Sequence, residues 1–89
     1  MGRLEAMDYQ LYGTAACHLC EQAERDLQSL GLRYTFHDIV DDPSNFARYQ
    51  ARIPVVVDAQ GHSLDAPFSL LDLLNWIAAS HPSRDGAAS

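Results

Sequence analysis

The chain contains the stretch Tyr12-Gly13-Thr14-Ala15-Ala16-Cys17-His18-Leu19-Cys20, which holds both of its cysteines, separated by two residues. A short β-prone stretch precedes the pair, and a helix-like run follows it from Leu19 to Leu30. At a strand-to-helix turn, two cysteines with this spacing form a redox motif when the surrounding pattern is βαβ, or half of a zinc site when a second ligand pair exists. The remainder of the sequence is needed to choose between these two interpretations.

Length and charge limit the classes of protein to which the chain can belong. Its 89 residues suit a single domain, because a chain this short cannot divide its core in two. The net charge is −6, and the six Lys and Arg positions are all arginine and are scattered along the sequence. We predict no nucleic-acid partner, since binding to phosphates needs a basic stripe. No apolar run approaches the roughly 20 residues of a membrane span, and no secretory signal is visible, so we predict a cytoplasmic monomer without a membrane partner.

The first half of the chain predicts a strand, a helix and a second strand. Residues 8–12 are β-prone and end at Gly13. The helix over residues 19–30 carries an apolar stripe, with Gly31 as its C-terminal stop. The stripe consists of Leu19, Ala23, Leu27 and Leu30, and the other helix faces carry Gln22, Glu24, Arg25, Asp26 and Gln28. Apolar and polar residues then alternate over residues 32–37, which is typical of a half-buried strand.

A second, shorter helix follows. Asp42 can cap it and Pro43 suits its first position, so we predict a helix over residues 43–51. Phe46 and Tyr49 are three residues apart and are predicted to face inward.

The last third of the chain predicts a hairpin and a final helix. Val55-Val56-Val57 is typical of a buried central strand, and a turn through Gly61 leads to a short antiparallel strand over residues 62–64. The final helix begins near Ser69, with Asp72 placed to complete a capping box. Its wide apolar face is predicted to be core and consists of Leu70, Leu71, Leu73, Leu74, Trp76 and Ile77.

The order βαβαββα predicts an α/β domain over residues 8–80, with a flexible extension at residues 1–7 and a flexible tail at residues 81–89. Strands separated by helices favour parallel pairing through right-handed crossovers, and the hairpin adds an antiparallel edge. We therefore predict a three-layer sandwich, in which helices cover both faces of a mixed four-stranded sheet.

This order, with Cys-x-x-Cys after the first strand and a proline at the start of the third, resembles the thioredoxin fold in its glutaredoxin-sized form. Three segments resemble the short bacterial glutaredoxin-like family, namely Cys17-His18-Leu19-Cys20-Glu21, Arg52-Ile53-Pro54-Val55 and Gly61-His62-Ser63-Leu64. The resemblance implies that Cys17 attacks a substrate disulfide and that Cys20 resolves the mixed disulfide. It also implies a cis peptide bond between Ile53 and Pro54, beside which the Ile53 backbone would pair with an extended substrate.

The chemistry of the motif supports the same roles. Cys17 would lie at a helix N-terminus, where unpaired backbone N–H groups and the helix dipole stabilise a thiolate. Cys20 lies one turn further into the helix and suits a resolving role. His18 has two interpretations that stay open. A protonated imidazole would favour the thiolate further, whereas an imidazole that points into solvent would do little.

Glutathione is a candidate co-substrate rather than a predicted cofactor. Glutaredoxins that use it usually carry Gly-Gly after the fourth strand, where this chain has Leu64-Asp65-Ala66-Pro67. Asp65 would then stand near a ligand carboxylate. Arg48, Gln50 and Arg52 are candidate compensating contacts, because a guanidinium can hold a carboxylate by two hydrogen bonds.

Three hypotheses follow for the function. The first is a thiol–disulfide oxidoreductase that acts on a protein or small-molecule disulfide through Cys17 and Cys20. The second is a redox-inert interaction module with the same fold. The third is metal or iron–sulfur binding through the same cysteines, although the sequence offers no second ligand pair of the kind that structural zinc requires and we predict no metal site.

Overall fold

The computed structural model describes residues 8–80, and the extension and tail predicted at residues 1–7 and 81–89 lie outside them. The elements are, in chain order, β1 (Asp8–Gly13), α1 (His18–Ser29), β2 (Arg33–Asp38), the 3₁₀ turn η2 (Ile39–Asp41), α2 (Pro43–Tyr49), β3 (Val55–Val57), β4 (Ser63–Asp65) and α3 (Leu70–Ser80). The predicted order βαβαββα is confirmed, with η2 as an addition that the sequence did not predict.

The four strands form one mixed sheet in the order β2-β1-β3-β4. β1 and β2 are parallel, and Gly13 pairs with Asp38 where both strands end. β3 is antiparallel to β1, so that Tyr12 pairs with Val55, and β4 is antiparallel to β3. The predicted α/β fold with a mixed four-stranded sheet is therefore confirmed.

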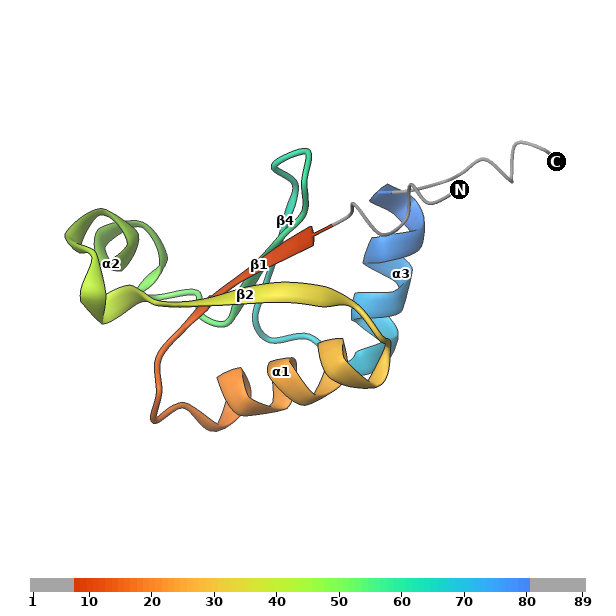
Figure 1. The fold of residues 1–89 in the computed structure, drawn as a ribbon, viewed down its shortest axis with the longest axis horizontal. Coiled ribbons are helices and arrows are strands. Elements are labelled where there is room, and N and C mark those ends of the chain that lie inside the picture. The colour runs from red at the N-terminus through yellow and green to blue at the C-terminus, as the bar shows by residue number, and fades with distance from the viewer. Residues whose placement is uncertain (1–7, 81–89) are drawn as a thin grey trace, which may run out of the picture.

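Parallel pairing across each helix is correct for β1 and β2 but wrong for β3. α1 has 12 residues and is about 18 Å long, which is enough to return the chain to the start of the sheet. α2 has 7 residues, about 10 Å, and lies at the end of the sheet to which β2 leads (Figure 1). β3 therefore starts at the end where β1 and β2 finish, and it runs back antiparallel to them.

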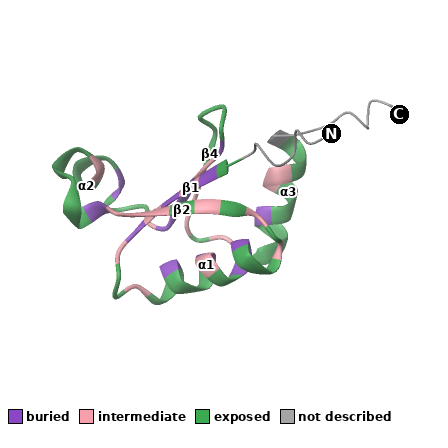
Figure 2. Cartoon of the chain, viewed as in Figure 1, coloured by how far each residue is buried: buried purple, intermediate pink, exposed green. Residues whose placement is uncertain are grey.

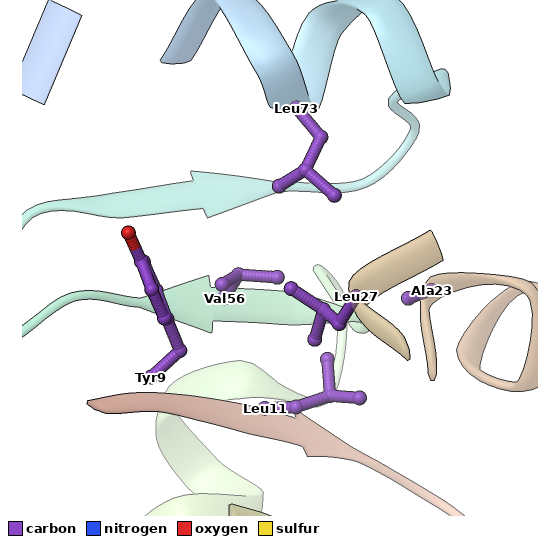
Figure 3. Packing of buried hydrophobic residues seen from close by; sticks show 6 residues of the cluster. All are labelled: Tyr9, Leu11, Ala23, Leu27, Val56 and Leu73. Atoms are coloured by element: carbon purple, nitrogen blue, oxygen red, sulfur yellow. The ribbon is translucent and has the colours of Figure 1, made fainter. Parts of the chain in front are cut away.

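The larger core lies between the sheet and the helices α1 and α3. Figure 3 shows six buried side chains from β1, α1, β3 and α3 that point into a common interior. They are Tyr9, Leu11, Ala23, Leu27, Val56 and Leu73. Trp76 of α3 packs against this cluster, and its ring centroid lies 6.2 Å from that of Tyr9.

A smaller core lies on the opposite face of the sheet. It consists of Ile39 of η2, Tyr49 of α2 and Val55 of β3, with Tyr12 and other half-buried residues packed against them. Successive residues of a strand point to opposite faces, so Val55 and Val56 contribute to different cores. The two cores separate three layers, as predicted.

Local sequence signals account for the ends of the helices. After α1, Gly31 has a φ of +72°, and the N–H of Leu32 donates to the carbonyl of Leu27 at 3.0 Å, which is the predicted glycine stop. Asp42 caps α2 through two backbone N–H groups. Before α3, the N–H of Ser69 donates to Asp72 at 2.9 Å and the N–H of Asp72 donates to Ser69 Oγ at 3.1 Å, so the capping box is confirmed.

The turn between β3 and β4 is built around a buried carboxylate, Asp58. Its Oδ1 accepts the backbone N–H groups of Gln60 and His62, both at 2.9 Å, and its Oδ2 lies 3.2 Å from Nδ1 of His62. Burial alone would raise the pKa of Asp58, but these hydrogen bonds and the imidazole outweigh it and lower the pKa from its ordinary value.

Some apolar residues predicted to be core are exposed. Figure 2 shows burial concentrated on the sheet and on the side of α1 that faces it. Phe46 is 43% exposed, so the prediction that it faces inward is wrong, whereas Tyr49 is buried. α2 packs on the sheet mainly through that tyrosine. The exposed leucines outside the two cores are Leu19, Leu70, Leu71 and Leu74. No helix within residues 8–80 is long and apolar enough to cross a membrane.

Candidate redox site

The turn from β1 to α1 places Cys17 at the N-cap of the helix. Its backbone is extended, with φ −108° and ψ 118°, and its Sγ accepts the backbone N–H of Cys20 at 3.1 Å. A sulfur therefore occupies the position at which a Ser, Thr or Asp oxygen usually caps a helix. The side chain of Cys17 is partly exposed. This position combines access to a substrate with backbone N–H groups and a dipole that stabilise negative charge on sulfur.

Cys20 lies one turn further along the helix and is only 1% exposed. Burial, followed by a hydrogen bond with the Cys17 sulfur, raises the pKa of the Cys20 thiol to about 12. The negative charge of Asp38, at the end of β2, acts in the same direction, and a hydrogen bond from the Thr14 backbone opposes it. Both cysteines are free thiols. The pair is thus asymmetric, with an accessible outer sulfur and a buried inner sulfur that keeps its proton.

Gly13 makes the burial of Cys20 sterically feasible. A Cβ atom at this position would lie 2.6 Å from Cys20 Sγ, 3.1 Å from Cys20 Cβ and 3.4 Å from an edge carbon of Phe36. Favourable contact between such atoms needs about 3.5–4.0 Å. The end of β1 therefore requires glycine because the sulfur of α1 occupies the space of a side chain. In the sequence alone, Gly13 indicates only the end of the strand.

His18 lies outside the protein interior. Its side chain is fully exposed, and its Nδ1 lies 3.9 Å from Oε1 of Glu21. Of the two interpretations left open, the geometry agrees with an imidazole that points into solvent.

Pro54 forms the second wall of the site. The peptide bond from Ile53 to Pro54 is cis, and so is the bond from Ala66 to Pro67. Pro54 is buried, and its carbonyl accepts the backbone N–H of Ala66 at 3.0 Å. Ile53 packs against the smaller core. The segment before β3 is therefore fastened to the segment after β4, beside the first turn of α1.

The four candidate glutathione contacts lie on α2, on the segment that follows it and on β4. Arg52 Nη1 donates to Asp65 Oδ2 at 3.0 Å, and Nη2 donates to the backbone carbonyl of Arg48 at 3.2 Å. The guanidinium carbons of Arg48 and Arg52 lie 5.9 Å and 5.5 Å from the ring centroid of Tyr49. Gln50 is exposed and its backbone N–H closes the last turn of α2. Because Arg52 already binds Asp65, much of its capacity to hold a ligand carboxylate is used within the fold.

An aromatic stack that the sequence pattern did not predict lies on the α2 side of the sheet. Tyr12 stacks on His37 with ring centroids 4.8 Å apart, and on Tyr49 with centroids 4.4 Å apart. His37 also contacts the side-chain oxygen of Gln10. Tyr12 and His37 are direct partners in the parallel ladder, so the strand register would have revealed their contact. The stack fixes the strand that leads into the cysteine turn.

A narrow cleft adjoins the site between α1 and the segment before α3. Its walls include Leu19, Gln22, Asp26, Pro54, Pro67 and Phe68. The helical pattern predicts Asp26 on a polar outer face of α1 and Leu19 on the inner stripe. Both placements are wrong, because Asp26 is 8% exposed and Leu19 is 56% exposed. The inner face of α1 is rotated toward Asp26 because the helix packs on the sheet through Cys20, Ala23 and Leu27.

Within residues 8–80, no group of three or more His, Cys, Asp or Glu residues is arranged to hold a metal ion.

The chain is similar in sequence to a protein family and in sequence and fold to a protein of known structure. It matches the model of a family described as Glutaredoxin-like domain (DUF836) over residues 9–78. It is similar to the protein XcR50 from X. campestris, whose X-ray structure is 36% identical and has a TM-score of 0.75, over 80% of this chain and 96% of that chain. The solution structure of XcR50 is 36% identical with a TM-score of 0.69, over 80% and 92% of the two chains. No curated protein matches the chain.

Proposed function

This chain belongs to the glutaredoxin-like domain family, and from that premise we propose that it is a thiol–disulfide oxidoreductase that uses Cys17 and Cys20. The observation that carries the proposal is the asymmetry of the pair. The outer sulfur caps α1 and accepts the Cys20 N–H at 3.1 Å, while the inner sulfur is buried and has a pKa raised to about 12. An exposed nucleophile and a protected resolving thiol need this arrangement.

The proposed reaction has two displacements. The Cys17 thiolate attacks one sulfur of a substrate disulfide, forms a mixed disulfide and releases the first substrate thiol. Cys20 then loses its proton and attacks the Cys17 sulfur, which releases the second thiol and leaves an intramolecular disulfide. The substrate gains two electrons and two protons, and the dithiol loses them. A reducing dithiol from another source must regenerate the protein after each cycle.

Loss of the negative charge on Cys17 in the first step favours deprotonation of Cys20 in the second step. Burial is the largest cause of the raised pKa of Cys20, and the hydrogen bond with the Cys17 sulfur and the negative charge of that sulfur raise it further. Once Cys17 is in a mixed disulfide that charge is gone, so the pKa of Cys20 falls when the thiolate of Cys20 is required. We propose that this coupling delays resolution until the substrate is attached.

Pro54 and the backbone of Ile53 are the proposed substrate platform. The buried proline lies beside the first turn of α1 and lines the same cleft as Leu19. Since proline has no N–H group, it offers no competing donor beside the thiolate. An extended substrate would pair with the Ile53 backbone in the manner of an added β-strand.

Two serine variants test the roles of the cysteines. Cys17→Ser keeps a good helix cap, so we expect it to fold and to lose reduction of bis(2-hydroxyethyl) disulfide. Cys20→Ser should react once and stop as a mixed disulfide, visible by mass spectrometry as one added mercaptoethanol group. The two variants control for one another, because each removes one thiol from the same helix. Full activity in Cys17→Ser would contradict the assignment of the nucleophile.

A redox titration separates the competing hypotheses. A dithiol that cycles should show one two-electron midpoint between the values of about −270 mV for thioredoxin and about −120 mV for a strong oxidant. A pair with no defined midpoint would favour a redox-inert interaction module. Stoichiometric zinc or iron in freshly purified protein would favour metal or cluster binding instead.

Glutathione is the less favoured electron donor in this proposal. Arg52 binds Asp65 at 3.0 Å, and the Asp65 carboxylate would repel a ligand carboxylate. We therefore propose a protein or small-molecule disulfide as the substrate of a cytoplasmic monomer. Gel filtration tests the monomer, and oxidation of the dithiol by glutathione disulfide tests the donor.

A further inference from the structure

The second step of the proposed reaction needs an acceptor for the proton of Cys20. This thiol is only 1% exposed, so bulk water has little access to it. With a pKa of about 12, roughly one such thiol in 10⁵ is ionised at pH 7 before a substrate is attached. The thiolate is the nucleophile of the step, so a group within the fold that accepts the proton would make the step faster.

The strand register brings one carboxylate beside the inner sulfur. Gly13 and Asp38 are the last partners in the parallel ladder between β1 and β2, and neighbouring strands lie about 4.8 Å apart. The Sγ of Cys20 occupies the side-chain space of Gly13, because it lies 2.6 Å from the position of a Cβ added there. Asp38 is therefore the neighbour of that sulfur on the next strand.

The side chain of Asp38 belongs to the face of the sheet that α1 covers. Side chains alternate between the two faces of a strand, and Tyr34 and Phe36 of β2 pack against the larger core. A ring carbon of Phe36 lies 3.4 Å from the position of a Cβ added at Gly13. Asp38 is the next residue in this row, and its negative charge acts on the Cys20 thiol.

The fold holds the Asp38 carboxylate by one oxygen and leaves the other available. Oδ1 accepts the backbone N–H of Val40 at 3.0 Å and thereby caps η2. Within residues 8–80, Oδ2 accepts no hydrogen bond and no basic side chain forms an ion pair with Asp38. The residue is half-buried, so a proton that it accepts can pass on to solvent. The other titratable group that acts on the Cys20 thiol is the sulfur of Cys17.

We propose that Asp38 accepts the proton of Cys20 as Cys20 attacks the mixed disulfide. The inference rests on the proposed redox function and adds a third residue to it. While the Cys17 sulfur is free, it is the hydrogen-bond partner of the Cys20 thiol. In the mixed disulfide that sulfur has no negative charge and is a weak acceptor. The Asp38 carboxylate is then the charged acceptor beside Cys20, within the reach that a general base needs, directly or across one water.

The two steps balance as follows. The Cys17 thiolate attacks one sulfur of the substrate disulfide, which forms the mixed disulfide and releases the first substrate thiolate. Cys20 then attacks the Cys17 sulfur while its proton moves to Asp38, so the bond to the substrate breaks and the second thiolate leaves. Asp38 gives the proton to that thiolate or to solvent and is again a carboxylate. Two electrons pass to the substrate, and the protein keeps a disulfide between its cysteines.

The test follows both steps in one stopped-flow reaction of the reduced protein with 5,5′-dithiobis(2-nitrobenzoate). Each step releases one coloured thionitrobenzoate. The first phase should be proportional to the concentration of the reagent, whereas the second, intramolecular phase should be independent of it. A carboxylate acceptor stays charged near neutral pH, so the second phase of the wild-type protein should change less than about twofold between about pH 6 and pH 8. Attack that depended on free ionisation of Cys20 would accelerate about tenfold per pH unit.

Three variants locate the effect. Asp38→Asn keeps an oxygen for the Val40 N–H but removes the acceptor, so the second phase at pH 7 should slow by about a hundredfold and should now accelerate with pH. The first phase should change far less. Asp38→Glu keeps a carboxylate and should restore part of the rate together with the weak pH dependence. Asp41→Asn is the matched control, because it removes the same charge from an exposed residue of η2 and should leave both phases unchanged.

The outcomes separate this inference from the redox function. If the wild-type protein releases no thionitrobenzoate, the proposed oxidoreductase is wrong and the inference falls with it. If Asp38 acts only through its charge, its removal lowers the pKa of Cys20, so a faster second phase in Asp38→Asn would overturn the inference and leave the redox function standing. A loss of rate without a steeper pH dependence would show a merely structural role. The wild-type pH profile remains decisive if Asp38→Asn does not fold, because a tenfold rise per pH unit there overturns the proposal.

Discussion

Substitution of Gly13 by alanine should show how strongly the burial of Cys20 depends on one missing side chain. The new methyl carbon would lie 2.6 Å from Cys20 Sγ, which is roughly 1 Å closer than favourable contact allows. Both residues are buried, so relief requires a shift of the helix start or of the strand end. Overpacking of this kind costs about 1–3 kcal/mol of unfolding free energy. For a domain of this size the loss corresponds to a fall in Tm of about 5–20 °C.

A double-mutant cycle assigns this cost to the sulfur. In a Cys20→Ala background the atom at 2.6 Å is absent, and the nearest contact is the Cys20 Cβ at 3.1 Å. Urea denaturation of the wild type, both single variants and the double variant should therefore give a favourable coupling energy of about 0.5–3 kcal/mol between the two substitutions. Gly31→Ala is the control, because its φ is +72° and no atom lies near the added carbon. It should cost about 1–2 kcal/mol through the backbone alone, with no dependence on Cys20.

The reasoning would be refuted by an equal cost of Gly13→Ala in the two backgrounds. Such a result would mean that the strand end, rather than the sulfur, disfavours a side chain at this position.

The remaining predictions concern charge, thiol reactivity and helix capping. Hydrogen bonds hold the pKa of Asp58 below its ordinary value, so the carboxylate stabilises the fold above the unfolded-chain value of about 3.9, and the stabilisation is lost as the pH falls through the lower folded-state pKa. Asp58→Ala should therefore cost about 1–3 kcal/mol in urea denaturation at pH 7 and much less at pH 2, and an equal cost at both would contradict this. With a pKa of about 12, roughly one in a thousand Cys20 thiols is ionised at pH 9, so iodoacetamide should modify Cys17 alone, as peptide mass spectrometry would check. Ser69→Ala should destabilise the domain by about 1 kcal/mol, and by clearly less once Asp72→Ala has already broken the reciprocal box.

The sequence allowed the fold to be predicted where the signal is local. Helix ends depend on a few neighbouring residues, so Asp42, Gly31 and the box at Ser69 could be assigned from spacing alone. The alternation of β2 and the apolar run of β3 likewise predicted strands at these places. The direction of β3 could not be predicted in this way, because it depends on how far a seven-residue helix carries the chain.

Burial on the helices was less predictable. When apolar residues cover a wide arc of a helix, more than one face of the helix could pack on a sheet. Tertiary contacts then determine which face is buried. Leu19 and Asp26 exchanged their expected places for this reason. The motif alone predicts that Cys17 and Cys20 lie close together. The contact between Gly13 and the Cys20 sulfur could not be predicted, because it depends on how closely β1 and α1 approach each other. The stack of Tyr12 on His37 similarly required the strand register.

The contact between Trp76 and Tyr9 gives the protein a built-in optical probe. Trp76 is the single tryptophan, and its ring lies 6.2 Å from a tyrosine that can transfer excitation energy to it. Tyr9 precedes Gly13 by four residues of extended strand, about 13 Å, so the pair is well separated from the cysteine turn. Emission excited at the tyrosine band should therefore follow unfolding of the larger core, with little quenching by the cysteines. Fluorescence can therefore report folding of the larger core in a sample whose thiols are being oxidised.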